Sequence, residues 1–119
     1  MQKLVYEQNW ENNLTEKDRN YIEEIFDNLS FDHSRKVDFT YLWQAINHRD
    51  DLLVTAIVHN LSGEDVLFNE TVVEYEGVAK DQFSLPVTLD AHTSMPWTFI
   101  FNSYNNAEKV SELVAPELE

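Results

Sequence analysis

The sequence contains no cysteine, only two glycines and only three prolines among its 119 residues. Without cysteine there is no disulfide framework, no thiolate zinc site and no cysteine nucleophile. Two glycines are too few for a phosphate-binding glycine loop or a collagen-like repeat. No segment has the roughly 18 apolar residues that a membrane-spanning helix needs, and no secretory signal pattern opens the chain. We therefore expect a cytoplasmic protein without membrane insertion.

Basic residues are also scarce, because eight Lys and Arg stand against 22 Asp and Glu and give a formal net charge of −14. A surface of this sign repels phosphates, which excludes nucleic acid as an expected partner. Apolar residues make up 43% of the chain, which is enough for a hydrophobic core. The length suits one domain. We expect it over residues 1–104, followed by an acidic tail over residues 105–119 that is either mobile or carries a short helix at Val110–Val114.

Hydrophobic periodicity predicts one helix followed by five to seven short strands. Apolar residues recur at helical spacing after Thr15, which predicts an amphipathic helix over residues 15–29. From Val37 the period becomes two, which is typical of strands. Because no helix separates the strands, the pattern favours a mostly β fold, an antiparallel immunoglobulin-like β-sandwich over residues 37–102 preceded by one N-terminal α-helix. The expected strands are residues 37–46, 52–59, 66–75, 78–85 and 95–102.

The first two strands are predicted to form a hairpin about the turn at residues 48–51. A tight turn places Trp43 opposite Ala56, and this register puts the apolar side chains of both strands on one face. The same register pairs Ala45 with Val54 and Tyr41 with Val58. Trp10 lies outside the strands and is expected to pack the N-terminal segment onto the sandwich. The predicted structural core is Tyr41, Trp43, Val54, Ala56, Val58, Trp97, Phe99 and Phe101.

No residue pattern predicts a catalytic or metal site. Three of the four histidines lie in expected turns or loops, and His59 is expected to be exposed, with Thr40 opposite it. The acidic pairs Asp50–Asp51 and Glu64–Asp65 would bind Ca²⁺ only if their turns met at one end of the sandwich, and an EF-hand spacing is absent. Neither a GxSxG elbow nor an SxxK motif is present. We therefore expect no catalytic residue, no metal ligand and no cofactor.

Three segments carry a resemblance to a known family. Residues 52–60 (LLVTAIVHN) are similar to a family strand that reads LVVTAFIRN, and residues 85–101 are similar to its closing pattern, LP followed by PWTFxF. Trp10-Glu11 followed by Leu14-Thr15 is similar to its W-E-x-x-L-S entry. Over residues 3–104 the chain thus resembles the SLAP domain, named for S-layer assembly proteins of Gram-positive bacteria. His59 and Met95 stand where the family has Arg, and both are expected at the surface.

The resemblance implies a function without catalysis. It indicates a protein-interaction module that assists accessory Sec-type export or the assembly of S-layer or envelope proteins, with export machinery or an S-layer precursor as partner. An unpaired sheet edge would also allow a homodimer. Two alternatives remain open at this point. One is a calcium-binding β-sandwich of an adhesion or envelope protein, and the other is a small hydrolase that uses a histidine and a carboxylate.

Overall fold

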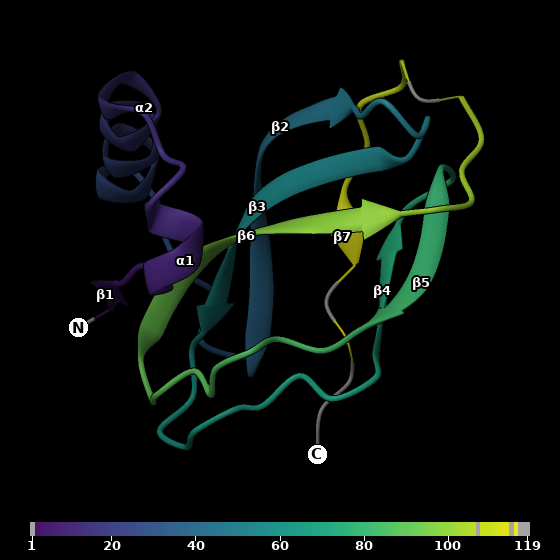
Figure 1. The fold of residues 1–119 in the computed structure, drawn as a ribbon. Coiled ribbons are helices and arrows are strands. Elements are labelled where there is room, and N and C mark those ends of the chain that lie inside the picture. The colour runs from purple at the N-terminus through teal and green to yellow at the C-terminus, as the bar shows by residue number, and fades with distance from the viewer. Residues whose placement is uncertain (1, 107, 115, 117–119) are drawn as a thin grey trace.

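The computed structural model describes residues 2–106, 108–114 and 116, and it has two sheets with helices against one of them (Figure 1). One sheet has the strand order β1-β6-β3-β2 and the other β5-β4-β7. The predicted mostly β, sandwich-like fold with an N-terminal helix is therefore confirmed. In chain order the elements are β1 (Lys3–Leu4), α1 (Gln8–Glu11), α2 (Glu16–Asp27), β2 (Val37–Ile46), β3 (Leu52–Asn60), β4 (Thr71–Tyr75), β5 (Ala79–Phe83), β6 (Thr93–Phe101) and β7 (Leu113–Val114).

Helix α2 forms where the sequence predicts it. Its N-cap is Thr15, whose Oγ1 accepts a hydrogen bond from the Asp18 backbone N–H at 3.1 Å, and the acidic first turn suits the positive end of the helix dipole. Ile22 is fully buried and packs with Leu42 and Ile57 of the first sheet. The helix therefore covers one face of that sheet, as Figure 1 shows.

Strand β3 is buried on both of its faces. Val54, Ala56 and Val58 are fully buried between the two sheets, where most of the hydrophobic core lies. Ile57 points to the opposite face, where α2 covers it. Because a helix lies on one side of the strand and a second sheet on the other, every residue of β3 except the half-buried Leu53 is buried, and the pattern is nearly continuous rather than alternating.

The predicted hairpin between β2 and β3 exists, but its predicted register is wrong. Tyr41 lies opposite Ala56 rather than Val58, and Trp43 lies opposite Thr55 rather than Ala56. A bulge between Tyr41 and Trp43 inserts one extra residue, Leu42, into β2. Beyond a bulge the side chains change faces. Trp43 therefore packs beside α2 instead of sharing the sandwich face with Tyr41.

Both ends of the described chain add short strands that the sequence did not predict. Lys3 and Leu4 pair with Thr93 and Ser94 in parallel, although the sandwich was expected to be antiparallel. Near the other end, β7 pairs with Glu74 and Tyr75 of β4. The short helix considered for Val110–Val114 is thus wrong, because Leu113 is the buried residue of a strand.

The N-terminal segment is fixed to the sheet through Trp10, as predicted. The Trp10 indole Nε1 donates a hydrogen bond to Thr98 Oγ1 at 3.1 Å. Thr98 Oγ1 also lies 2.9 Å from Thr55 Oγ1 on the neighbouring strand. The indole ring itself belongs to the apolar cluster beneath α2. A polar bridge thus joins α1, β3 and β6 within the layer between helices and sheet.

Candidate functional site

The residues predicted as core divide between the two faces of the first sheet. Five of them are buried between the sheets, namely Val54, Ala56, Val58, Phe99 and Phe101. Tyr41 and Trp97 pack against the same cluster and are half-buried. Trp43 lies on the other face, in the cluster beneath α2. The space between the sheets is therefore filled by packed apolar side chains.

The histidines do not come together. His33, His48 and His92 are exposed in turns and loops. His59 is only 2% exposed, so the expectation that it lies at the surface is wrong. Met95, expected at the surface for the same reason, is buried as well. Within the described ranges no group of three or more His, Asp or Glu side chains is placed to hold a metal ion.

His59 lies in a network of hydroxyl groups between the sheet and the segments that cover it. Its Nε2 is 2.8 Å from Thr40 Oγ1, and its Nδ1 is 2.6 Å from Ser94 Oγ. The Phe31 ring packs edge-on against the imidazole at 5.0 Å between centroids. Burial disfavours the charged imidazolium and lowers the pKa of His59 to about 4, although the charge of Asp38 acts in the opposite direction. The side chain is therefore neutral at pH 7, and its role is structural.

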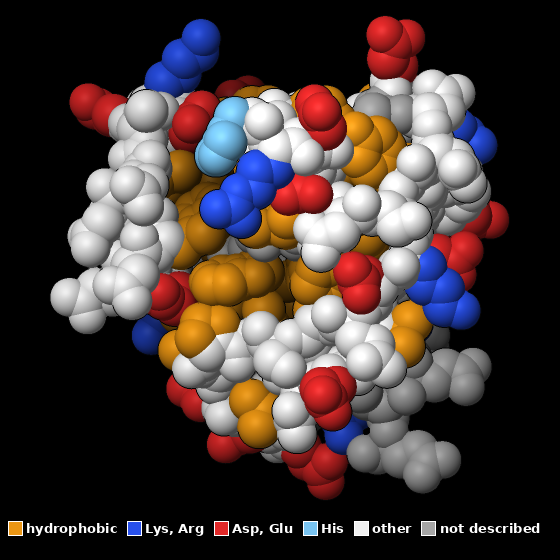
Figure 2. All heavy atoms as spheres, turned by 45° about the vertical axis from the view of Figure 1, so that its right-hand side comes forward, with side chains coloured by type: hydrophobic (Ala, Val, Ile, Leu, Met, Phe, Trp, Pro, Cys, Tyr) orange, Lys and Arg blue, Asp and Glu red, His pale blue; other side chains and the backbone are white. Residues whose placement is uncertain are grey.

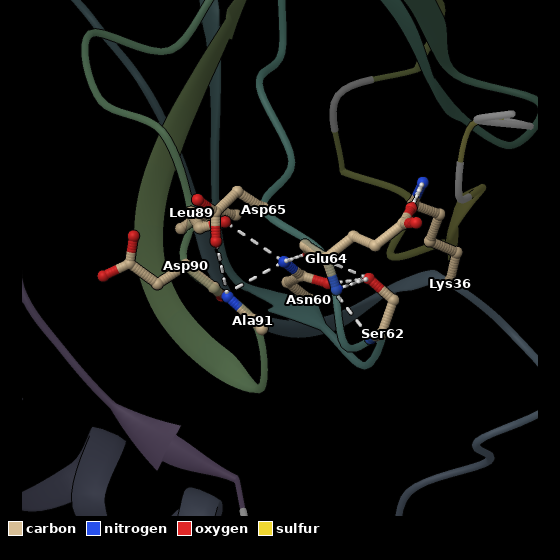
Figure 3. A network of polar contacts seen from close by, with 8 residues as sticks. All are labelled: Lys36, Asn60, Ser62, Glu64, Asp65, Leu89, Asp90 and Ala91. Carbon is tan, nitrogen blue, oxygen red and sulfur yellow. Dashed lines mark hydrogen bonds and ion pairs between the residues drawn. The ribbon is translucent and has the colours of Figure 1, made fainter.

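Asn60 ties two loops together at the end of β3 (Figure 3). Its Nδ2 donates to the backbone oxygens of Glu64, Leu89 and Asp90 at 2.7, 3.1 and 3.1 Å. Its Oδ1 accepts from the Ser62 N–H and hydroxyl. Asn60 is fully buried, so these bonds satisfy a side chain that would otherwise be costly to bury. The network fixes the shape of the loop before β6.

The acidic turns considered for calcium lie at opposite ends of β3. Asp51 is in the turn before this strand, and Glu64 is in the loop after it. A nine-residue strand separates them by about 25 Å, so the two turns cannot share one ion. Glu64 Oε2 pairs with Lys36 Nζ at 3.3 Å, and Asp65 Oδ1 accepts from the Ala91 N–H at 3.1 Å. These carboxylates brace loops rather than converge on a cation.

An apolar groove lies on the helix-covered face of the first sheet, beyond the end of α2. Ala45 pairs with Leu53, and Leu53 pairs with Ile100, so these three side chains share that face. The Tyr21 ring of α2 lies 6.1 Å from the Trp43 ring at its border. Figure 2 shows hydrophobic side chains gathered in a hollow of the surface, with acidic, basic and histidine side chains around it. We define the apolar groove as Tyr21, Trp43, Ala45, Leu53 and Ile100.

The groove is exposed to an extent that core packing does not require. Ile100 and Tyr21 retain 46% and 43% of their accessible surface. Contiguous exposed apolar surface with a polar border is typical of protein-binding sites, because its contact with water is unfavourable until a partner covers it. The groove is therefore a candidate surface for protein recognition.

Strand β2 forms an outer edge of the same sheet, and this edge is partly blocked. The Phe39 N–H donates to the Asp38 carboxylate at 2.9 Å. A cleft of about 500 Å³ runs beside this edge and is lined by Asp38, Arg35 and Glu112 among others. The bulge in β2 and the capped N–H make the edge a poor template for another strand. Sheet extension therefore remains only a prediction.

Comparison with protein families identifies the chain. The model of the SLAP domain matches residues 4–114, which is nearly the whole sequence. The chain belongs to the SLAP domain family. Searches of curated proteins and of solved structures found no significant match. The resemblance seen in the sequence is thus confirmed, and the match extends to β7.

Membership in the SLAP domain family corrects one expectation and supports others. The family is non-catalytic and is associated with S-layer and cell-surface assembly proteins, so this SLAP domain is an S-layer-associated envelope domain. That association points to an extracellular or surface location, and the cytoplasmic prediction is wrong. None of the described helices is long and apolar enough to span a membrane.

The sequence contained weak signals for the features that were missed. Thr55 and His59 of the strand LLVTAIVHN alternate with apolar residues, and they point to the face that the helical layer covers. Amphipathic α2 needed a surface to bury Ile22, and the outward face of that strand was the available one. The burial of His59 follows from this argument, whereas nothing local marks the groove or the bulge.

Proposed function

We propose that this domain binds another protein during the assembly of the S-layer or cell envelope, with accessory Sec-type export as the more specific process. The match to the SLAP domain over residues 4–114 is the observation that carries the proposal. The structure contributes a surface suited to it, because Ile100 and Tyr21 of the apolar groove are exposed and the chain around them is acidic overall, with a formal net charge of −14. The contact on the partner is then a segment that carries both apolar and basic residues.

The charge of the domain supports a basic segment rather than a second copy. Two chains with a formal net charge of −14 repel each other, whereas a Lys- and Arg-containing segment is attracted. An S-layer or envelope precursor that is still unfolded can present such a segment in extended form. Burial of Ile100 and Tyr21 against it provides affinity, and the surrounding charge provides faster association.

The test is affinity capture with two matched surface variants. Ile100→Arg places a charge in the groove, and Val72→Arg places the same charge at a similarly exposed position of β4 in the other sheet. Immobilised wild type, I100R and V72R are exposed to envelope and secreted fractions of the host at low and moderate salt. Mass spectrometry identifies the proteins retained, and thermal melting shows that the variants are folded.

We expect an S-layer or export protein to be retained by the wild type and V72R and lost with I100R. Retention should weaken with salt, because exposed charges are screened. If I100R retains the same protein as V72R, the groove is not the contact. If no S-layer, envelope or export protein is retained under either salt condition, the proposed function itself is wrong.

A further inference from the structure

A separate pocket lies between the N-terminal segment and the loop that precedes β6. Its volume is about 420 Å³, which is within the range of small-ligand sites. The pocket joins segments that are far apart in sequence, and the pairing of β1 with β6 and the Asn60 network hold both of them in place. We call it the Glu7 pocket. Its lining includes Val5, Glu7, Val87, Asp90, Thr93 and Met95.

The carboxylate of Glu7 is the unusual group in this pocket. Glu7 is only 9% exposed. Glu7 is the N-cap of α1, and both of its carboxylate oxygens lie within hydrogen-bond distance of one donor, the Asn9 N–H, at 3.0 and 2.8 Å. Among the described residues no Lys, Arg or His forms an ion pair with it. A carboxylate with a single N–H partner keeps further acceptor capacity, to which a cationic donor can bind.

A second carboxylate borders the same pocket. The Asp90 backbone oxygen is held by Asn60 Nδ2 at 3.1 Å and by Thr93 Oγ1 at 2.6 Å. Its carboxylate is exposed and points away from the Asn60 network in Figure 3. Asp90, like Glu7, forms no ion pair within the described part of the chain. The lining therefore holds two acidic side chains and no basic one.

The rest of the pocket lining combines four aliphatic side chains with uncharged polar ones. Val5 and Met95 lie on the two paired segments at one side, and Val87, which is 37% exposed, lies in the loop at the other. Lys and Arg side chains combine an apolar stem with a charged end, and they bury the stem along apolar surface while the end meets carboxylates. A neutral ligand would leave Glu7 without a cation, and an anion would be repelled.

We propose that the Glu7 pocket binds a Lys or Arg side chain of the partner protein. The cationic end meets the carboxylates of Glu7 and Asp90, and the methylene stem lies against Val87 and Met95. This inference rests on the proposed protein-binding function for the origin of the side chain. It places a second, charge-selective contact outside the apolar groove, so that one partner segment is recognised by an apolar anchor and by a basic residue.

The pocket can be tested on the purified domain without knowledge of the partner. N-acetyl-arginine amide is the probe, and N-acetyl-citrulline amide, which has nearly the same shape and no charge, is the control. Backbone amide shifts are followed by NMR during titration of each compound. We expect saturable shifts at residues 5–9, 87–90 and 93–95 with the arginine compound only. Because charge-assisted hydrogen bonds dominate, Glu7→Gln should weaken binding about tenfold.

Two further variants keep the proposal falsifiable. Asp90→Asn removes the second charge while the backbone bonds of Asp90 stay, and Val87→Trp fills the pocket in case Glu7→Gln disturbs the cap of α1. Shifts that do not saturate and spread over the acidic surface would overturn the proposal, as would equal affinity for citrulline or unchanged binding in E7Q and V87W. Failure here leaves capture through the groove intact, so the two proposals fail separately.

Discussion

The two faces of the β1-β6-β3-β2 sheet are built on different principles. The face toward the second sheet is mostly apolar, with Val54, Ala56 and Val58 on β3 and Phe99 and Phe101 on β6, all fully buried. It also includes a polar contact, the hydrogen bond from the Tyr75 hydroxyl to Gln44 Oε1 at 2.8 Å. The face toward the helices mixes apolar contacts with hydrogen bonds. Side chains of Thr55, His59, Ser94 and Thr98 are bonded there, next to Ile57.

The difference shows which interactions stabilise each face. Between the sheets, stability comes from the volume and area of buried apolar groups, and one group substitutes for another at a graded cost. Beneath the helices, each buried polar atom needs its own hydrogen-bond partner, so the loss of one partner leaves another buried group without a hydrogen bond. The two faces should therefore respond differently to loss of volume, to acid and to loss of a hydroxyl.

The largest effect is expected from loss of volume between the sheets. Phe99→Ala should lower the free energy of unfolding by about 3–5 kcal/mol, because a large fully buried side chain leaves a cavity. Urea denaturation measures this change. Phe99→Leu keeps most of the volume and should cost less than half as much. Equal losses for the two variants would mean that the aromatic contacts, rather than filled volume, hold this face together.

A smaller and pH-dependent effect is expected from His59 on the opposite face. Its pKa is about 4 in the folded chain and 6.5 in an unfolded one, so the unfolded state binds the proton first as pH falls. The contribution of His59 is complete above pH 6.5 and is lost between pH 6.5 and 4. The free energy of unfolding falls in total by about 3 kcal/mol, because each unit of difference between the two pKa values corresponds to about 1.36 kcal/mol. Below pH 4 no further loss comes from this group.

The measurement is urea denaturation of wild type and His59→Gln from pH 7 to pH 4. Carboxylates titrate in both proteins, so the difference between the two profiles isolates the imidazole. We expect the wild type to lose more stability on acidification than the variant, because Gln does not bind a proton. Parallel profiles would show that His59 does not remain neutral inside the folded domain.

The smallest effect is expected from removal of one hydroxyl on the helix-covered face. Thr98→Val keeps the shape of the side chain but leaves the Trp10 indole N–H and the Thr55 hydroxyl without this hydrogen-bond partner. The free energy of unfolding should therefore fall by about 1–2 kcal/mol. Thr88→Val in the exposed loop is the control and should stay within about 0.5 kcal/mol of wild type. A T98V variant as stable as T88V would mean that water satisfies both groups.

Sequence periodicity predicted the sandwich face better than the helix-covered one. The strands with clear alternation, β2, β3 and β6, and the amphipathic helix α2 lie where they were expected. Alternation specifies which residues share a face as long as the strand is regular. The bulge at Leu42 is not marked by glycine or proline, so the register of Trp43 could not be read from the sequence.

The candidate sites depend on contacts that no local pattern encodes. The apolar groove exists because α2 covers only part of a sheet face, so that Leu53 stays half-buried and Ile100 stays exposed. The Glu7 pocket exists because β1 pairs with β6 in parallel and brings Val5 beside Met95. Both depend on where distant segments dock, which composition and spacing do not specify. Membership in the family, in contrast, was evident from short motifs.

The short strands near the two ends of the chain have a consequence for when the domain can fold. Lys3 and Leu4 pair with residues 93–94, and β2 and β3 pair with each other but also require β6. The other sheet is completed only by Leu113 and Val114. Contacts of such long sequence separation form late and slowly. A ribosome or a translocation channel that still holds the last third of the chain therefore holds an unfinished domain, with its segments extended and available to other proteins.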